Sequence, residues 1–546
     1  MRDGPKLYTV VCRPKRAAGP LPVVLTRGYW PGFEDDARRF CRAGYAYVGQ
    51  STRGHGKSEG AGGIARRFFH DAADGHDTLS WIAEQDWSDG RVAMFGKSYW
   101  AITQWLVAAL GHPNLRAIVP QVSPTDPWDC GYWRGGALLL AMSARGRAYD
   151  KRHWPEIDAM GWDAFFRHLP LRTLDEVVGS PNPDRVEAES RQLWRDYVEH
   201  STFDDYWRAL SMRADGADGH LSRIQVPVFQ MGGWYDAYPG ASLRVFETLQ
   251  AAGNVPDNRI IIDPTDHLNR VAGDRDFGLR VGKDEISLAI RWLDHVVKGV
   301  ENGVRDEKPV RMFAMGANEW REFDHWPPAR AVPTKYYLHP GELRNDLPGV
   351  DVEPSRYTYD PADPVPTLGG NHSFSDVNIP HIIRPGAVDQ RPIECRDDVL
   401  VFSTEPLATA TEVTGPVRVR LFASSSAKDT DFVARLVDVA PDGTAYNLTE
   451  GILRARFRRS IWQQPELLTP GEVDQYDIEL LPTSNVFRRG HRIRLHVTSS
   501  GFPLWDRNPN TGSQTGFDSE MIPAHQVVHH DRSRPSHVLL SLLPLA

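Results

Sequence analysis

The sequence lacks the features that define several classes of protein. Its four cysteines, at positions 12, 41, 130 and 395, form no Cys-x-x-Cys pair, so we expect reduced thiols and neither a zinc site nor a disulfide framework. It has no run of about 18 apolar residues, which a membrane-spanning helix would require. Residues 1–6 carry no apolar segment of the kind found in a secretory signal peptide. Together these absences predict a cytoplasmic protein.

Basic residues are also fewer than acidic residues. The chain of 546 residues has 63 Lys and Arg against 71 Asp and Glu, for a net charge of −8. Surfaces that bind nucleic acids or anionic membranes need a local excess of basic residues. We therefore expect neither kind of partner and predict a small-molecule ligand. A homodimer is compatible with these features.

The order of apolar runs and amphipathic segments divides the chain into parts. Strand-like runs alternate with helical segments in residues 1–125 and again in residues 216–304, which is typical of a parallel α/β sheet. Between them, residues 126–215 are rich in Trp and Arg and mainly helical. We predict that this insertion is a helical cap over the carboxyl edge of the sheet, where ligands of such sheets bind.

After about residue 305 the helical periodicity nearly disappears. Short β-branched runs separated by turn residues recur through residues 305–546, beginning with residues 310–314. This spacing predicts an all-β sandwich, most simply a jelly roll. The predicted fold class is therefore α/β: an α/β domain with a helical cap insertion, followed by an all-β jelly-roll domain.

One segment suggests a nucleophile. Residues 92–97 predict a strand, Ser98 stands at a sharp turn, and a helix follows. In a nucleophile elbow such a strand–turn–helix exposes a serine oxygen above a parallel sheet, with a small residue on either side of the serine. Gly96 supplies the first small residue, and we expect Ala101 to replace the usual second glycine.

A serine nucleophile needs a base that accepts its proton and a carboxylate that orients the base. In α/β hydrolases these residues follow in the order Ser, Asp or Glu, His, on loops after strands. Asp236 follows one predicted strand of the second α/β segment, and His267 follows the next. We predict Ser98, Asp236 and His267 as the catalytic residues. Asp263 and Asp266 compete for the acid's role, but both lie too close to His267 in sequence to face its ring easily.

Two further patterns are weaker. A glycine-rich segment after Ser51 ends like a phosphate-binding loop, but Ser51 itself stands where that motif has its first glycine. Asp71, Asp74, His76 and Asp77 have metal-ligand spacing, yet a helix N-cap at Asp71 followed by a solvated face explains them better. We therefore expect no metal and no cofactor.

Longer motifs resemble a known family. In the N-terminal half they are Ser51-Thr52-Arg53-Gly54-x-Gly56-x-Ser58-Glu59-Gly60, Trp81-Ile82, Trp87-x-Asp89-Gly90 and Gly233-Trp234-Tyr235-Asp236. In the C-terminal half they are Asp360-Pro361-Ala362-Asp363-Pro364-Val365-Pro366, Asp389-Gln390-Arg391-Pro392-Ile393, Asp429-Thr430-Asp431-Phe432 and Ser484-Asn485-Val486-Phe487. These motifs are similar to those of the bacterial cocaine esterase group, which is related to X-prolyl dipeptidyl peptidases and α-amino acid ester hydrolases. The resemblance covers nearly the whole chain and is weakest in the helical cap.

The resemblance implies an α/β-hydrolase domain, a cap and a jelly roll that closes the pocket. It also implies an oxyanion hole with two donors, the backbone N–H after the nucleophile, here that of Tyr99, and a tyrosine hydroxyl shortly after the first sheet strand. Two residues compete for the second position. Trp30 matches without a gap and could donate through its indole, whereas Tyr29 matches after a one-residue deletion. We prefer Tyr29 because its hydroxyl ends a rigid ring.

The resemblance further implies a serine esterase that forms an acyl-enzyme on Ser98 and cleaves carboxylic esters or amides. We predict that Trp100 and Tyr238 line an apolar or aromatic acyl pocket under the Trp-rich cap. The residues after Asp236 are Ala237, Tyr238 and Pro239, and not the carboxylates with which α-amino acid ester hydrolases hold a substrate ammonium. The sequence leaves as alternatives an X-Pro dipeptidyl peptidase, a β-lactam or amide acylase, an acyltransferase and a non-catalytic ligand-binding protein.

Overall fold

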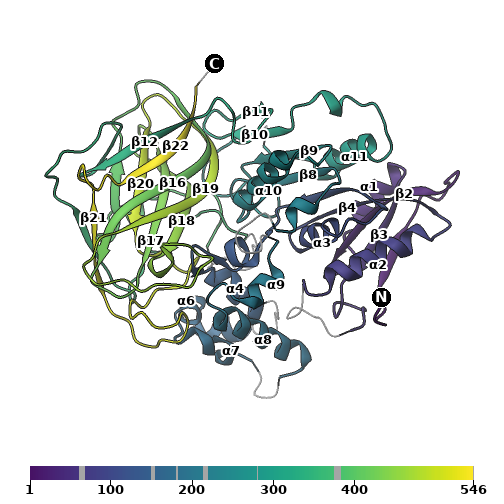
Figure 1. The fold of residues 1–546 in the computed structure, drawn as a ribbon, viewed down its shortest axis with the longest axis horizontal. Coiled ribbons are helices and arrows are strands. Elements are labelled where there is room, and N and C mark those ends of the chain that lie inside the picture. The colour runs from purple at the N-terminus through teal and green to yellow at the C-terminus, as the bar shows by residue number, and fades with distance from the viewer. Residues whose placement is uncertain are drawn as a thin grey trace.

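The computed structural model describes residues 1–60, 68–148, 154–179, 183–212, 219–278, 281–373 and 383–544. An α/β part that contains the N-terminus lies beside a β-rich part that contains the C-terminus, with a group of helices at their junction (Figure 1). Within these ranges, no helix combines the length and the apolar character that crossing a bilayer requires.

The α/β part is built on a nine-stranded sheet in the order β1-β3-β2-β4-β5-β8-β9-β10-β11. Its strands are β1 (Thr9–Cys12), β2 (Leu21–Gly28), β3 (Ala46–Ser51), β4 (Ser88–Lys97), β5 (Leu115–Gln121), β8 (Val228–Gly233), β9 (Asn258–Asp263), β10 (Val310–Ala314) and β11 (Glu319–Phe323). The strands from β3 to β10 are parallel, and the edge strands β1 and β11 pair antiparallel. This is the predicted parallel α/β sheet.

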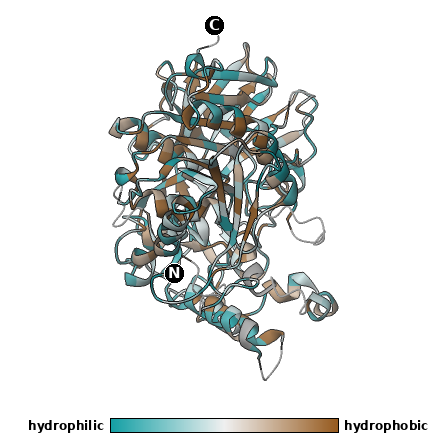
Figure 2. Ribbon diagram, turned by 90° about the vertical axis from the view of Figure 1, so that its right-hand side faces the viewer, coloured by the Kyte–Doolittle hydropathy of each residue, from teal (hydrophilic) through white to brown (hydrophobic). Residues whose placement is uncertain are grey.

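Helices cover both faces of this sheet, because alternate residues of each strand point to opposite sides. Val23 and Leu25 pack with one set of helices, whereas Val24 between them packs with the other. The first set is α2 (Asp71–Ala83), α3 (Tyr99–Ala108) and α10 (Pro239–Ala252), and the second is α1 (Glu34–Arg42) and α11 (Glu285–Val296). Figure 2 shows hydrophobic residues along the strands inside the molecule and hydrophilic residues along the outer helices.

The strand β10 corrects one assignment made from the sequence. The pattern assigns residues 310–314 to the C-terminal β domain, but Val310 pairs in parallel with Ile260 of β9 and so belongs to the α/β sheet. A short apolar strand has the same pattern in either kind of sheet. Its neighbours in space decide where it belongs.

The segment between β5 and β8 forms the cap at the junction of the two parts. It contains the π-helical turn η1 (Pro127–Gly131), the hairpin strands β6 (Trp133–Arg134) and β7 (Ala137–Leu138), and the helices α4 (Leu140–Ala148), α5 (Trp154–Met160), α6 (Trp162–Phe166), α7 (Leu174–Val177), α8 (Arg185–Glu199) and α9 (Asp205–Leu210). The helix α4 begins only after this hairpin, because Gly135 and Gly136 have positive φ and form the turn of the hairpin. Residues 149–153, 180–182 and 213–215 of the predicted cap lie outside the described residues.

The β-rich part contains an eleven-stranded sheet. Its strands are β12 (Val332–His339), β13 (Glu342–Arg344), β14 (Ser355–Tyr359), β15 (Leu400–Ser403), β16 (Thr411–Ser425), β17 (Asp431–Val439), β18 (Ala445–Arg454), β19 (Asp474–Phe487), β20 (Arg492–Thr498), β21 (Ala524–His529) and β22 (His537–Leu543). The long strands pair antiparallel, as predicted for a β-rich domain. The jelly-roll topology stays a prediction.

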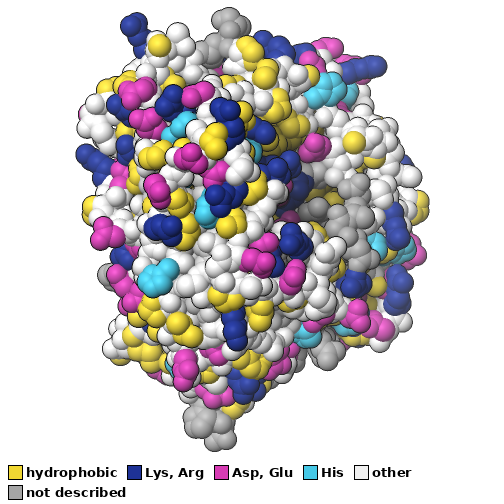
Figure 3. All heavy atoms as spheres, turned by 60° about the vertical axis from the view of Figure 1, so that its left-hand side comes forward, with side chains coloured by type: hydrophobic (Ala, Val, Ile, Leu, Met, Phe, Trp, Pro, Cys, Tyr) yellow, Lys and Arg dark blue, Asp and Glu magenta, His cyan; other side chains and the backbone are white. Residues whose placement is uncertain are grey.

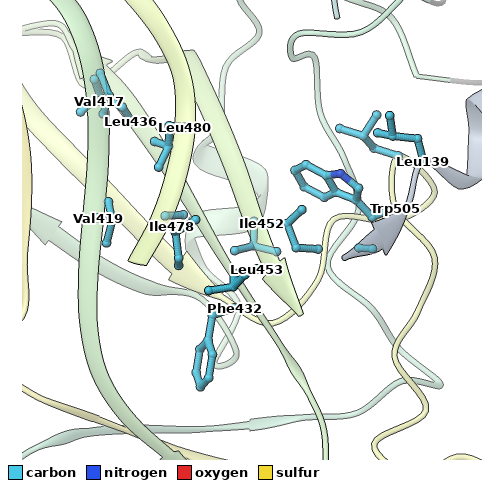
Figure 4. Packing of buried hydrophobic residues seen from close by; sticks show 14 of the residues in the cluster. Leu139, Val417, Val419, Phe432, Leu436, Ile452, Leu453, Ile478, Leu480 and Trp505 are labelled. Carbon is cyan, nitrogen blue, oxygen red and sulfur yellow. The ribbon is translucent and has the colours of Figure 1, made fainter. Parts of the chain in front are cut away.

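The cap and the β-rich part share a hydrophobic core. Leu139, just before α4, lies beside Trp505 of the β-rich part (Figure 4), and both belong to the same buried cluster. Hydrogen bonds reinforce this contact, since the N–H of Ala141 donates to the carbonyl of Pro503 at 3.0 Å.

On the face of the molecule in Figure 3, basic and acidic side chains are interspersed.

Candidate active site

Ser98 connects β4 to α3 in a strained turn. Its backbone angles, φ 57° and ψ −121°, are costly for a residue with a side chain. Its N–H donates to the carbonyl of Gln121 at 2.9 Å and so ties the turn to β5. A sharp, strained strand-to-helix connection of this kind has the form of a nucleophile elbow.

The fit of Trp100 explains how this elbow departs from the usual pattern. Trp100, and not Ala101, stands two positions after Ser98, where the pattern usually has glycine, so the predicted role of Ala101 is wrong. The indole fits because a Cβ atom on Gly28 would lie only 2.3 Å from it, and the missing Cβ gives it room. Its Nε1 donates to the carbonyl of Trp30 at 3.3 Å. Trp100 is therefore packed against β2 and is not among the described residues that line the cavity beside Ser98, which differs from its predicted place in the pocket.

Asp236 and His267 are brought together by the loops after β8 and β9. Nδ1 of His267 lies 2.7 Å from Oδ1 of Asp236, and the side chains are 13% and 1% exposed. The second carboxylate oxygen of Asp236 accepts the N–H of Tyr238 at 3.2 Å. A carboxylate held in this way fixes one imidazole nitrogen as a donor and leaves the other for proton transfer.

The two carboxylates that compete with Asp236 in the sequence have other partners. Asp263 forms a buried ion pair with Lys283, at 2.8 Å. Asp266 accepts backbone N–H groups of its own loop. The geometry therefore favours Asp236 as the partner of His267.

A cavity of about 730 Å³, including its open mouth, lies between the elbow and the cap. Ser98 and Tyr99 line it from the elbow, and Tyr132 and Tyr197 line it from the cap, where their rings stack with centroids 4.0 Å apart. Tyr238 also lines it, and its ring lies 5.8 Å from that of His267. None of the described lining residues has a charged side chain.

The tryptophans of the cap do not form this wall. Trp128 and Trp133 are at most 1% exposed and belong to the hydrophobic core. The aromatic surface of the cavity is made instead by tyrosines and by Phe68. Sequence composition predicts an aromatic lining but cannot separate core tryptophans from lining tyrosines, because both are large and largely apolar.

The two candidates for the second oxyanion donor differ in position. Tyr29 lines the same cavity as Ser98, and its ring stacks on Tyr99 with centroids 4.5 Å apart. Trp30 is 44% exposed, and its ring packs against Trp100 at 4.4 Å. Of the two, Tyr29 is the one that lines the cavity together with Ser98.

Two acidic residues of α2 are placed differently from the prediction. Asp74 is buried and binds the guanidinium of Arg53 through two contacts of 2.7 Å, whereas a solvated face was expected. Asp71 is the first residue of α2, and its carboxylate accepts the hydroxyl of Tyr99 at 2.8 Å. The partners, Arg53 and Tyr99, are distant in sequence, so the spacing of residues within the helix cannot predict them.

Comparison with known proteins agrees with this architecture. Residues 3–269 match the model of the X-Pro dipeptidyl-peptidase (S15) family, and residues 302–539 match that of the X-Pro dipeptidyl-peptidase C-terminal non-catalytic domain. The cocaine esterase of Rhodococcus sp. (strain MB1 Bresler) is 37% identical over 586 aligned positions, which cover 100% of this chain and 97% of that protein.

Two solved structures share the fold over nearly their full length. One is an aminopeptidase from the marine sediment archaeon Thaumarchaeota archaeon, 27% identical with a TM-score of 0.82, with 100% of this chain and 95% of that chain covered. The other is an α-amino acid ester hydrolase, 25% identical with a TM-score of 0.83, with coverage of 99% and 95%. The α/β-hydrolase fold, followed by a β-rich domain, is thereby confirmed.

Proposed function

The chain belongs to the X-Pro dipeptidyl-peptidase (S15) family and, within it, to the group of the bacterial cocaine esterase, and on this premise we propose that it cleaves carboxylic esters through an acyl-enzyme on Ser98. Membership makes it a serine-type carboxylic ester hydrolase. The proposal concerns which residues perform the chemistry and which acyl groups the cavity accepts.

In the proposed mechanism His267 accepts the proton of Ser98 as the serine oxygen attacks the carbonyl carbon of the ester. The tetrahedral intermediate collapses, and the alcohol leaves with the proton that His267 returns. Water then attacks the acyl-enzyme by the same route and releases the acid. Asp236 holds the imidazole in position and stabilises its charged form.

The negative charge on the carbonyl oxygen is stabilised by two donors in this proposal. One is the N–H of Tyr99, which lies at the start of α3, where backbone N–H groups have no partner within the helix and the helix dipole is positive. The other is the hydroxyl of Tyr29. Loss of one such donor typically costs about 10²–10³-fold in kcat.

One observation carries the proposal: Ser98, on its strained turn, lines the same cavity as Tyr238, and Tyr238 contacts both members of the Asp236–His267 pair. Its N–H donates to Asp236, and its ring lies against that of His267. Ser98, Asp236 and His267 lie on three separate loops and follow in the chain order that an acyl-transfer site requires, which supports the proposal. The cavity does not favour an aminoacyl or peptide substrate, because no described lining residue has a carboxylate that could pair with the ammonium group of such a substrate.

The absence of charge on the described cavity wall supports a neutral, apolar or aromatic acyl group. The test is the hydrolysis of p-nitrophenyl acetate, butyrate, octanoate and benzoate, with kcat/KM measured for each. We expect kcat/KM to rise from acetate to butyrate and to remain high for benzoate. An unchanged value across the series would contradict an acyl pocket, and preferential transfer of the acyl group to an added alcohol over water would show an acyltransferase.

A further inference from the structure

The side chain of Tyr99 joins the two halves of the proposed oxyanion hole. Its backbone N–H is one proposed donor, and its ring stacks on Tyr29, which provides the other, with an interplanar angle of 25°. The ring centroids are 4.5 Å apart, and rings stacked this closely restrict each other's tilt. The position of Tyr99 therefore affects both donors at once.

Asp71 anchors the far end of this ring. The Tyr99 hydroxyl lies 2.8 Å from Oδ2 of Asp71 and 3.2 Å from Oγ1 of Thr52, and the tyrosine is 3% exposed. Burial and the neighbouring carboxylate raise the pKa of Tyr99 well above its usual value, so the phenol stays protonated and donates. Hydrogen bonds from a neutral donor to a carboxylate are short and strong, and they hold geometry well.

The same carboxylate oxygen also holds the pocket wall. Oδ2 of Asp71 accepts the N–H of Phe68 at 2.9 Å, and Phe68 lines the cavity. Phe68 has a φ of 80°, which is costly for a bulky residue and persists only where other contacts impose it. On the other side, Nη1 of Arg27 donates to the carbonyl of Asp71 at 2.8 Å and fixes the start of α2.

A carboxylate is energetically costly at the buried start of a helix. Asp71 is 4% exposed, and burying an ionised group costs several kcal/mol unless hydrogen bonds compensate for its lost hydration. A neutral side chain could accept one N–H at lower cost. The use of a buried charge at this point is explained if its function is to hold the tyrosine.

We propose that Asp71 is a positioning residue for ester hydrolysis: its carboxylate holds Tyr99, and through the stacked rings Tyr29, where the oxyanion forms. This inference rests on the proposed function, because it takes Tyr29 and the N–H of Tyr99 as the donors. Without the hydrogen bond between Tyr99 and Asp71, the donors are displaced in the transition state, whereas Asp71 still holds the N–H of Phe68 and the acyl pocket keeps its shape. The rate constant kcat therefore falls and KM does not.

The test is the variant Tyr99→Phe, which removes the hydroxyl and leaves the ring. We expect kcat for p-nitrophenyl butyrate to fall about 10-fold, a fraction of the loss for a whole donor, with KM within twofold. Binding of phenylboronic acid, which forms a tetrahedral adduct with the serine, weakens by a similar factor. Asp71→Asn, which keeps an acceptor but no charge, gives a smaller loss. Tyr45→Phe is the control, since it removes a partly buried tyrosine–aspartate bond of 2.9 Å, to Asp294, at the amino end of β3.

A double variant separates positioning from general stability. In the Tyr29→Phe background, Tyr99→Phe should lower kcat by no more than about 3-fold, because one of the two donors that its hydroxyl positions is already gone and only the N–H of Tyr99 remains. An equal loss in both backgrounds, or values of kcat and boronate affinity within twofold of the wild type, would overturn the inference. If Tyr29→Phe alone leaves kcat unchanged, the proposed oxyanion hole itself is wrong. If Tyr29→Phe is impaired and Tyr99→Phe is not, only the role of Asp71 is refuted.

Discussion

Oδ1 of Asp236 accepts a hydrogen bond from Nδ1 of His267 across 2.7 Å, in a setting where the carboxylate is 1% exposed. This contact determines which imidazole nitrogen faces the reaction, so Asp236→Asn should turn the ring to an unproductive tautomer. We expect kcat for p-nitrophenyl butyrate to fall by about 10³–10⁴-fold, with KM within a few-fold. Thermal unfolding of the variant serves as the control for folding. A well-folded variant with kcat within 10-fold of the wild type would contradict the assignment.

The uncharged cavity predicts discrimination against cationic acyl groups. The p-nitrophenyl ester of 3-phenylpropionic acid and that of phenylalanine differ mainly in one α-ammonium group. Since no described lining residue can pair with this charge, its desolvation should reduce kcat/KM by about 10²-fold or more for the amino ester. The value of kcat/KM is measured for both esters at pH 6, where the amine of the amino ester is protonated. Equal values of kcat/KM, or a preference for the amino ester, would point to a carboxylate that faces the cavity.

A buried carboxylate beside the cavity predicts a pH-dependent contribution to stability. Burial raises the pKa of Asp126 from 3.8 to about 6. The folded state therefore binds the proton more tightly than the unfolded state, and the contribution to stability is fully present below about pH 4 and is lost as the pH rises through about 6.

Asp126→Asn removes this ionisation and keeps an acceptor for the N–H of Trp128, which Oδ1 of Asp126 binds at 2.9 Å. Between pH 4 and pH 7, we expect the free energy of unfolding of the wild type to fall by roughly 2 kcal/mol relative to that of the variant, because most of a shift of about two pK units is expressed in this window. Urea unfolding at both values measures it. A difference between variant and wild type that does not change with pH would show that this carboxyl does not titrate as described.

Arg454 stabilises the contact between the β-rich part and the cap. It pairs with Asp431 at 2.9 Å and with Asp506 at 3.0 Å, and all three side chains are 1% exposed. Asp506 also accepts the N–H of Leu138 in the cap at 2.8 Å. Arg454→Met would leave two buried carboxylates without their cation, so we expect a loss of about 3–5 kcal/mol in the free energy of unfolding.

The matched control for this prediction is Arg420→Met. Arg420 pairs with Asp477 at 2.7 Å, but the two side chains are 42% and 54% exposed. Exposed pairs contribute at most about 1 kcal/mol, so this variant should unfold nearly as the wild type does. Denaturant unfolding of both variants compares them, and losses of equal size would contradict the view that burial makes the difference.

The sequence predicts the α/β sheet well because each buried parallel strand is a continuous apolar run between turn residues. Residues 23–26 illustrate this, since they lie within β2 and pack on both faces of the sheet. The β-rich part is harder to predict. The strand β18 (Ala445–Arg454) lacks the pattern that would predict a buried strand, because it carries Asn447, Thr449 and Glu450, all of them buried, where apolar residues are expected. Glu450 is buried because it pairs with Arg435 of β17 at 2.9 Å, a contact that only the fold creates.

The candidate site divides in the same way. Ser98, Asp236 and His267 can be predicted because each follows a recognisable strand, and chain order then limits the choice. Trp100 and Asp71 cannot be placed in this manner. The first fits against a missing Cβ on Gly28, and the second accepts from a tyrosine 28 residues away in sequence. Contacts between distant segments have no local pattern to reveal them.

The most direct test of the account is a burst experiment with p-nitrophenyl butyrate on the wild type and on Ser98→Ala, followed by intact-mass measurement of the quenched protein. We predict a burst of nitrophenol with the wild type and a mass increase equal to one butyryl group, and neither with the variant, which should remain folded. A butyryl adduct on Ser98→Ala, or hydrolysis by that variant at the wild-type rate, would contradict Ser98 as the nucleophile.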